Sequence, residues 1–346
     1  MPPTTSNGRS RRRPTMADVA AQAGVSRTLV SFVLDGKPGA SEDTKRRVLA
    51  VAAELGYRPD AAAQLLALGR SRTLGVLLDM SQLFEGELVT NIYPAAEAVG
   101  HDVLLTANLR GRTEAAAMES LLSHRCGALI LLGPSSSTDE LVELSERAPL
   151  VVVGRRLPKS ATTGMIGTVR TNDTKGMGLA VDYLVDLGHR DIAHVDGGDD
   201  PGSADRRNGY RAAMRRHGLD ESVRVIPGAH TEEAGAAAGQ VIMRSHRLPT
   251  AILAGNDRCA LGLLDVFSRA GIRVPDDISL MGYDDSRLSD SPRIDLSTVH
   301  QDADGLATRA VETAVGLLGD TLSAGGDIVL EPTLRIRGTT TARADA

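Results

Sequence analysis

Short apolar runs alternate with longer amphipathic stretches from about residue 73 to residue 281. The runs at 128–132 and 150–153 are wholly apolar and have the length of buried strands, whereas the stretch between them has the mixed polarity of a surface helix. Alternation of this kind predicts parallel sheets covered by helices on both faces, and about 270 residues are enough for two similar lobes. Predicted strands are 74–78, 103–106, 128–132, 150–153, 192–195, 223–226, 251–253 and 278–281; predicted helices are 86–99, 113–123, 138–147, 173–187, 204–217, 231–244 and 259–270.

The first 60 residues follow a different pattern, in which short helical segments are separated by glycine turns. Thr15 opens a capping-box pattern and predicts a helix that Gly24 ends. Ser26 predicts the start of a second helix, through residue 34, and Ser41 the start of a third, which Gly56 stops. A helix, a glycine-containing turn and a second helix have the spacing of a helix-turn-helix, so the sequence predicts an all-helical head.

The second of these helices has two distinct faces. At 100° per residue, four aliphatic side chains share one arc and four other side chains share the opposite arc. An arginine can pair with guanine or a phosphate, hydroxyls suit either, and an aromatic ring can contact a thymine methyl. An ordinary amphipathic helix with its polar face toward solvent has the same pattern, so both interpretations stay open. The inward set is Leu29, Val30, Val33 and Leu34, and the outward set is Arg27, Thr28, Ser31 and Phe32.

An alanine- and leucine-rich segment at 61–68 follows the third helix. Its helix propensity is high, but a helix of about nine residues is marginal when it is alone in water. Two interpretations are compatible with it: a linker helix docked on the rest of the chain, or a helix that forms only when two copies meet on DNA.

Charge is unevenly distributed along the 346 residues. Residues 1–72 carry 12 Lys and Arg against 6 Asp and Glu, whereas the remainder carries 27 against 38. A small basic segment on a large acidic one suggests a head that binds a polyanion. Four arginines within residues 1–14 supply much of this asymmetry, so a solvated basic tail is the alternative interpretation.

Composition excludes several classes of protein. The two cysteines, Cys126 and Cys259, are far apart and argue against a disulfide framework or a cysteine-based metal site. The longest apolar runs are far below the ~18 residues that span a bilayer, and residues 1–14 lack the apolar core of a secretory signal. We therefore expect a cytoplasmic protein without a membrane partner.

The head contains the runs Met16-Ala17-Asp18-Val19-Ala20, Ala23-Gly24-Val25-Ser26, Val30-Ser31, Val33-Leu34, Gly36-Lys37, Val48 and Leu55-Gly56-Tyr57-Arg58-Pro59. With these motifs it resembles the DNA-binding head of the lactose/galactose repressor family of bacterial transcription regulators. The resemblance implies that the second helix enters the major groove, that paired hinge helices enter the minor groove, and that Leu66 wedges into a base step there. Family members commonly have Arg where this chain has Phe32, and Asn and Arg where it has Asp60 and Gln64, so operator sequence does not transfer. The predicted DNA contacts are Thr15, Ser26, Arg27, Thr28, Ser31, Phe32, Tyr57, Ala63 and Leu66.

Polar residues cluster where the predicted strands of the body end. Asn256 and Asp284 each follow such a strand, and Arg206 opens a helix after another. A ligand of parallel sheets binds beyond the carboxyl ends of the strands, and a cation with a carboxamide and a carboxylate suits the hydroxyls of a sugar-like molecule. Phe84 is a candidate to stack on that ligand or to pack in the core, and Arg155 is a second candidate cation. Helix capping is the alternative role for the aspartates near these positions.

The body resembles the effector domain of the same family, which is similar to periplasmic sugar-binding proteins. In relatives, the positions that match Arg206, Asn256 and Asp284 contact the effector. The carrying motifs are Leu187-Gly188-His189-Arg190, Arg206-Arg207-Asn208-Gly209-Tyr210, Pro249-Thr250-Ala251, Asn256-Asp257, Ala260-Leu261-Gly262, Val274-Pro275-Asp276-Asp277-Ile278-Ser279 and Gly282-Tyr283-Asp284-Asp285.

The expected fold is an all-α helix-turn-helix head with a hinge helix, joined to an α/β two-lobed domain like the periplasmic binding proteins. The expected boundaries are a basic tail at 1–14, the helix-turn-helix domain at 15–59, the hinge helix and linker at 60–72 and the effector-binding and dimerisation domain at 73–346. In the latter, we expect lobe 1 at about 73–171 and 302–325 and lobe 2 at about 172–301 and 326–346.

The predicted function is that of a transcriptional repressor, located at the nucleoid, which binds a palindromic DNA operator as a homodimer or higher oligomer. A small-molecule effector, sugar-like, would control it from the cleft between the lobes. No enzymatic activity, cofactor or metal is expected, because the sequence lacks a P-loop, a Gly-x-Ser-x-Gly elbow and a complete dinucleotide fingerprint. A cluster of His189, His194, Asp196, Asp199 and Asp200 matches no metal-ligand spacing. The alternative is a ligand-binding or sugar-modifying protein whose head is a vestigial interaction module.

Overall fold

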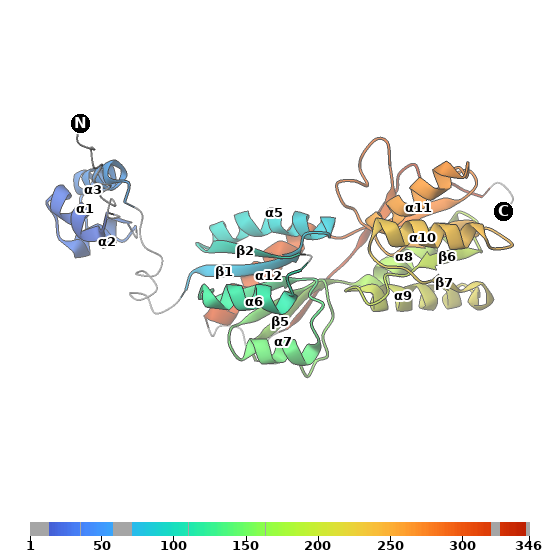
Figure 1. Cartoon of the computed structure of the whole chain (residues 1–346), viewed down its shortest axis with the longest axis horizontal. Helices are drawn as coiled ribbons and strands as arrows, with labels where there is room; N and C mark the ends of the chain where they lie inside the picture. The colour runs from blue at the N-terminus through green and yellow to red at the C-terminus, as the bar shows by residue number, and fades with distance from the viewer. Residues whose placement is uncertain are drawn as a thin grey trace, which may run out of the picture. The chain divides into compact units, whose positions relative to one another are not determined.

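The computed structural model describes residues 14–34, 36–57, 71–109, 111–162, 164–319 and 326–343. The chain divides into two compact units, with the boundary after Ser71 (Figure 1). We call the unit up to Ser71 the head and the unit from Arg72 the body.

The described part of the head contains the helices α1 (Met16–Ala23), α2 (Arg27–Leu34) and α3 (Glu42–Leu55). Their apolar faces meet in a small aliphatic core, as the predicted inward face of the second helix requires. The buried members of this core are Val19, Ala20, Ala23, Val30, Val33, Val48 and Ala52.

The predicted signals at the ends of the head helices are confirmed. The hydroxyl of Thr15 accepts a hydrogen bond from the backbone N–H of Asp18, whose carboxylate accepts the Thr15 N–H at 2.7 Å. Gly24 and Gly56 end α1 and α3 with φ of 65° and 64°, which is the left-handed region that favours glycine. The predicted basic tail up to residue 13 and the predicted hinge helix at 61–68 lie outside the described residues.

The body alternates strands and helices as predicted. The strands are β1 (Thr73–Asp79), β2 (Asp102–Asn108), β3 (Ala128–Leu132), β4 (Leu150–Val153), β5 (Ile166–Thr171), β6 (Ile192–Val195), β7 (Arg224–Ile226), β8 (Ala251–Ala254), β9 (Ser279–Asp284), β10 (Ser297–His300), β11 (Asp327–Leu330) and β12 (Thr333–Arg335). The helices are α5 (Leu83–Ala98), α6 (Glu114–Ser123), α7 (Thr138–Ser145), α8 (Asp173–Asp186), α9 (Ser203–Arg216), η1 (Asp220–Ser222), α10 (Glu232–Met243), α11 (Asp257–Arg269) and α12 (Ala303–Leu318).

Two six-stranded sheets form within the described part of the body. Their orders are β2-β1-β3-β4-β5-β11 and β7-β6-β8-β9-β10-β12. The pairings are parallel, as predicted, except that β12 runs antiparallel to β10. We call the first sheet with its helices lobe 1 and the second with its helices lobe 2.

Helices cover both faces of each sheet (Figure 1). In lobe 1, α5 and α12 pack against one face and α6 and α7 against the other. In lobe 2, α10 and α11 cover one face and α8 and α9 the other. The strands β1, β3, β4 and β8 are therefore buried over most of their length and have the near-continuous apolar sequences typical of doubly wound α/β folds.

The chain passes between the lobes after β5, after β10 and after β11. The expected assignment of 326–346 to lobe 2 is corrected here, because β11 pairs with β5 in lobe 1 from Asp327 to Leu330. Only after Leu330 does the chain return to lobe 2, where β12 pairs with β10. Among the described helices, none combines the length and apolarity that a bilayer crossing needs.

Candidate functional site

The head presents one face of α2 to its surroundings. Arg27, Thr28 and Phe32 are exposed, Phe32 by 38%, and Ser31 is half-buried. Val30 and Val33 lie on the opposite side, in the core. The exposed face carries a guanidinium group, a hydroxyl and a ring, which are the groups that the sequence analysis assigns to DNA contact.

The other predicted DNA contacts differ in their exposure and in their hydrogen bonds. The hydroxyls of Thr15 and Ser26 are exposed but already accept backbone N–H groups at the starts of α1 and α2. Tyr57 is half-buried against the head core. Ala63 and Leu66 lie outside the described residues.

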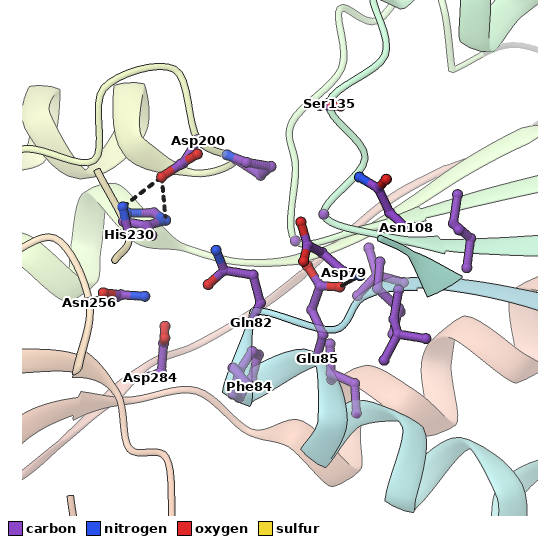
Figure 2. A pocket seen from close by; sticks show the side chains of 18 of the residues that line it. Asp79, Gln82, Phe84, Glu85, Asn108, Ser135, Asp200, His230, Asn256 and Asp284 are labelled. Atoms are coloured by element: carbon purple, nitrogen blue, oxygen red, sulfur yellow. Dashed lines mark hydrogen bonds and ion pairs between the residues drawn. The ribbon is translucent and has the colours of Figure 1, made fainter. Parts of the chain in front are cut away.

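The body contains a cleft at the carboxyl ends of strands from both lobes, as a doubly wound sheet predicts. The space that its walls border, open solvent at the mouth included, is about 890 Å³. Figure 2 shows Asp79, Glu85 and Asn108 on one side of the cleft and His230, Asn256 and Asp284 on the other. The described lining residues are Leu77, Leu78, Asp79, Gln82, Phe84, Glu85, Leu88, Asn108, Glu114, Leu132, Gly133, Ser135, Val153, Gly154, Asp200, Pro201, Arg206, His230, Asn256, Asp284 and Gln301.

Arg206, in the first turn of α9, is the central cation of the cleft and is only 6% exposed. Its Nε donates to Oδ1 of Asp173 at 3.0 Å, and its Nη1 donates to the carbonyl of Gly255 at 2.7 Å. Its Nη2 lies 3.5 Å from Oδ1 of Asp284, and its Cζ lies 3.7 Å from the centroid of the Tyr283 ring. The guanidinium plane is thus fixed on several sides before any ligand arrives.

A glycine permits this arrangement. Gly202, the N-cap of α9, has φ of 81°, and a Cβ there would lie 3.1 Å from Oδ2 of Asp173 and 3.5 Å from Nε of Arg206. The close approach of the chain to the ion pair therefore favours glycine at this position.

Asn256 and Asp284 hold their positions through different contacts. Asn256 is the N-cap of α11, and its Oδ1 accepts the Cys259 N–H at 2.9 Å. Asp284 accepts a hydrogen bond from Nε2 of Gln301 at 2.8 Å, and burial raises its pKa to about 7. Both side chains are buried yet line the cleft.

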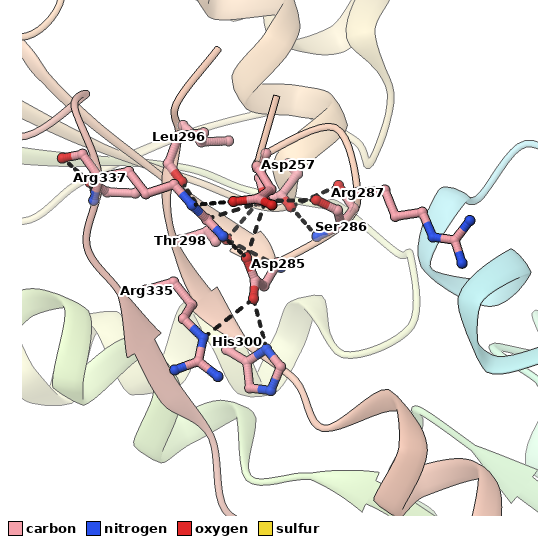
Figure 3. Close-up of polar contacts among 12 residues, drawn as sticks. Asp257, Asp285, Ser286, Arg287, Leu296, Thr298, His300, Arg335 and Arg337 are labelled. Atoms are coloured by element: carbon pink, nitrogen blue, oxygen red, sulfur yellow. Dashed lines mark hydrogen bonds and ion pairs between the residues drawn. The ribbon is translucent and has the colours of Figure 1, made fainter. Parts of the chain in front are cut away.

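The backbone at the end of β9, at Asp284 and Asp285, is strained and is held by hydrogen bonds. Asp284 and Asp285 have φ of 112° and 59°, a region that non-glycine residues rarely adopt. Asp285 accepts hydrogen bonds from Nη2 of Arg337 at 2.7 Å and from Nδ1 of His300 at 2.8 Å (Figure 3). These hydrogen bonds to Asp285 stabilise the strained backbone conformation, which in turn fixes the direction of the Asp284 carboxylate.

Asp257 supports the same turn from α11. Its Oδ2 accepts the N–H and the hydroxyl of Ser286, at 2.7 and 2.9 Å, and its Oδ1 accepts the Thr298 hydroxyl at 2.7 Å (Figure 3). The carboxylate thus ties α11 to the turn after β9 and to β10.

The structure brings four of the five predicted effector contacts together: Phe84, Arg206, Asn256 and Asp284 all line the cleft. Arg155 does not join them. Its Nη1 donates to the carbonyls of Pro134, at 3.1 Å, and Ser136, and the side chain lines a neighbouring hollow. A turn after a strand end can direct a side chain away from the ligand, and sequence position alone does not show which way it points.

Several residues of the cleft are not among the site residues predicted from the sequence. Asp173, the partner of Arg206, follows β5, which was not among the predicted strands. The pair Asn172-Asp173 repeats the pair Asn256-Asp257 and could have signalled it. Glu85 lies in the first turn of α5, which begins before the predicted start at residue 86. The other missed lining residues include Asp79, Asn108, Glu114, Asp200, His230 and Gln301.

The histidines that suggested a metal cluster have structural partners. His189 contacts the hydroxyl of Thr250 and the carbonyl of Thr341, both at 3.0 Å. His194 is buried in β6, with Nδ1 3.0 Å from the carbonyl of Leu253, and burial lowers its pKa to about 4. Within the described residues, no three His, Cys, Asp or Glu side chains converge on a metal position.

Contacts across the mouth of the cleft join the lobes. Nη1 of Arg258 in lobe 2 donates to the carbonyl of Ser81 in lobe 1 at 2.6 Å. The backbone N–H of Arg287 donates to Oε1 of Glu87 at 2.8 Å. These hydrogen bonds must break or shift when the lobes change their spacing.

Two sequence families match this chain. Residues 15–60 match the bacterial regulatory proteins of the lacI family, and residues 181–340 match a periplasmic binding protein-like domain. Catabolite control protein A of Priestia megaterium is 32% identical over 292 residues, covering 83% of this chain and 87% of that protein.

Solved structures agree with these matches. A LacI transcriptional regulator from a Rhodococcus species is 45% identical, with a TM-score of 0.75, over 78% of this chain and 98% of that one. The lac repressor dimer bound to operator and the anti-inducer ONPF is 28% identical, with a TM-score of 0.82, over 96% of this chain and 100% of that one.

Proposed function

Because the chain belongs to the lacI family of bacterial regulatory proteins, we propose that it is a repressor whose homodimer binds a palindromic operator under the control of a small molecule. The observation that carries the proposal is the presence, on one chain, of a helix-turn-helix with an exposed polar α2 face and a two-lobed body with a polar cleft. The operator-bound dimer of the lac repressor supports the assembly and the DNA partner.

In this proposal, Arg27, Thr28, Ser31 and Phe32 of α2 read the major groove, and the hinge at 60–72 reads the minor groove. Thr15 and Ser26 contact the phosphate backbone at the N-termini of α1 and α2, the ends of a helix that favour an anion. Tyr57, which follows the C-terminus of α3, contacts the phosphate backbone through its hydroxyl. The cytoplasmic nucleoid is the compartment in which such contacts occur.

The ligand of the proposed regulator lies between the lobes, against Phe84, Arg206, Asn256 and Asp284. Closure around it changes the contacts at Ser81 and Glu87 and hence the spacing of the two hinge segments of a dimer. Coupling of this kind is about 1–3 kcal/mol in other systems, which corresponds to changes of several-fold to about a hundred-fold in operator affinity.

A gel shift tests the proposal. The full chain is titrated into a palindromic fragment from its own promoter region and into a scrambled fragment of equal length at moderate salt. We expect a specific shift whose affinity falls steeply with salt, because phosphate contacts release counterions. Equal affinity for both fragments would contradict the proposal and favour the vestigial-head alternative. Repeating the titration with a ligand found by thermal shift distinguishes release of DNA from corepression.

The hinge is tested by Leu66→Gly. We expect a strong loss of affinity for the palindrome and little change for the scrambled fragment, because the wedge stabilises only the kinked, specific complex. A matched Leu68→Gly change controls for the flexibility that glycine adds to the segment. An equal loss on both fragments would mean that the hinge contributes no sequence-dependent contact.

A further inference from the structure

The two walls of the cleft differ in their chemistry. The lobe 2 wall combines donors and acceptors, since Arg206, Asn256 and Gln301 stand beside the carboxylate of Asp284. The lobe 1 wall presents the carboxyl groups of Asp79 and Glu85 beside the amides of Gln82 and Asn108 (Figure 2). The carboxyl group of Glu114 lines the same wall. A ligand thus meets mixed partners on one side and concentrated negative charge on the other.

Glu85 is the most deeply placed carboxyl group of the lobe 1 wall. It is only 8% exposed, and its Oε2 accepts the backbone N–H of Asp79 at 2.5 Å. Within the part of the chain that the structure describes, no arginine, lysine or histidine side chain forms a hydrogen bond or ion pair with Glu85. Figure 2 shows the side chain directed into the cleft.

The charged side chains that act most strongly on Glu85 are acidic. They come from three different elements: Asp79 at the end of β1, Glu114 at the start of α6 and Asp284 at the end of β9. The cleft cation Arg206 is already paired with Asp173 and lies close to Asp284. The protein therefore supplies no counter-ion for the Glu85 carboxyl group from these elements.

The neighbouring carboxylates are held in place by the backbone. Glu114 accepts the N–H and hydroxyl groups of both Ser135 and Ser136, at 2.6 to 3.1 Å. Oδ1 of Asp79 accepts the Ser81 N–H at 2.7 Å. These bonds keep the negative charge beside the cleft and prevent the side chains from turning away to solvent.

A buried carboxyl group without a counter-ion either keeps its proton or pairs with a cation from outside. We propose that the ligand supplies that cation: it is an amino sugar or amino polyol whose ammonium group lies against Glu85 while its hydroxyls lie against Arg206, Asn256 and Asp284. The proposal rests on the proposed function, because it names the ligand class of the same cleft. Burial raises the pKa of Glu85 well above its usual value, and an ammonium group beside the carboxyl group would oppose that shift.

Calorimetry with matched ligands tests the proposal on the full chain. The pairs differ only in an amine for a hydroxyl: D-glucosamine and D-glucose, D-galactosamine and D-galactose, D-mannosamine and D-mannose, and 1-amino-1-deoxy-D-glucitol and D-glucitol. We expect at least one amine to bind about tenfold or more tightly than its partner, the gain of a buried charge-assisted hydrogen bond. The preference for that amine should weaken as the pH is lowered, because protonation of Glu85 competes with the ammonium group for the carboxylate.

The variant Glu85→Gln should bring the two affinities of a pair within about threefold and remove the pH dependence of the preference. Glu97→Gln is the matched control, because it makes the same change on the exposed face of α5, outside the cleft, and should leave both unchanged. If Glu85→Gln lowers the melting temperature too far for titration, the amine preference of the wild-type chain and its weakening at lower pH still decide the question.

Three results would overturn the proposal: amines that bind no more tightly than their hydroxyl partners, no binding of any amine, or an undiminished preference in Glu85→Gln. None of these results affects the gel shift on the palindromic fragment, which uses no ligand. Loss of that shift would refute the proposed function instead, so the two failures are distinguishable.

Discussion

Replacing Arg206 with alanine is expected to destabilise the body by about 3–5 kcal/mol, the usual cost of removing one partner of a buried ion pair. The change leaves the carboxylates of Asp173 and Asp284 buried without their cation and the carbonyl of Gly255 without its donor. For a unit of this size, the melting temperature should fall by roughly 10 °C. Ligand response should vanish while operator binding persists, because the head folds around its own core.

The pH dependence of this variant has a definite sign. Burial already raises the pKa of Asp173 above its usual value and that of Asp284 to about 7, and the guanidinium group of Arg206 opposes both shifts. Without Arg206, these folded-state pKa values rise further above the unfolded values. For an acid with a raised folded-state pKa, the ionised form is less stable in the folded state than in the unfolded state. The free energy of unfolding therefore falls as the pH rises above about 4, where the acid begins to ionise in the unfolded chain. The deficit relative to the wild type should therefore be smaller at pH 5 than at pH 8.

Arg206→Lys is the matched comparison. Lysine keeps the charge but cannot reproduce the separate contacts of Nε, Nη1 and Nη2, so we expect a smaller loss of stability and a weakened ligand response. Thermal unfolding followed by calorimetry at pH 5 and pH 8 measures both variants. A normal ligand response in Arg206→Ala would remove this residue from the binding site.

Local signals in the sequence were sufficient to predict most of the helices and strands. The capping box at Thr15 and the left-handed glycines after α1 and α3 are determined by a few neighbouring residues, and they appear where they were predicted. The apolar runs of β3, β4 and β6 likewise match the predicted bounds, because a strand buried on both faces needs no partner to be recognised.

Features that depend on tertiary contacts were not recognised. The strand β10 contains Ser297 and Thr298, whose hydroxyls are buried in hydrogen bonds to other segments, so its composition does not predict a buried strand. The position of β11 in lobe 1 depends on pairing with β5, more than 150 residues earlier in the chain. Pairing over such distances leaves little trace in a single sequence.

The residues of the candidate site likewise divide into those that local sequence signals predict and those that depend on tertiary contacts. Arg206 was found from its place at a helix start after a strand, but its partner Asp173 was not, because the ion pair joins α9 to α8 across 33 positions. Glu85 was missed because the first turn of α5 begins at Leu83, before the amphipathic pattern becomes clear. Strand ends can be read from sequence, whereas the direction of each side chain depends on the packing around it.

The head offers the second large effect, through Val30→Asp. Val30 is fully buried in the aliphatic core of the head, where a carboxylate has no partner among the described core residues. Burying an unpaired charge costs several kcal/mol, and the core of so small a domain supplies only about 3–5 kcal/mol. We therefore expect the head to unfold and specific operator binding to fall below detection. The thermal transition and ligand binding of the body should not change, because the body has separate cores.

Leu49→Asp is the control, since Leu49 lies on α3 in the same head and is 53% exposed. It introduces the same charge without burying it, so it should cost well under 1 kcal/mol and leave the head folded. Its operator affinity should fall only a few-fold, through electrostatic repulsion that disappears at higher salt. Gel shifts at two salt concentrations and amide NMR spectra of both variants distinguish an unfolded head from a folded head that the DNA repels. If Val30→Asp bound the operator as well as Leu49→Asp does, the α2 face would not depend on the core beneath it, and the proposed reading helix would be wrong.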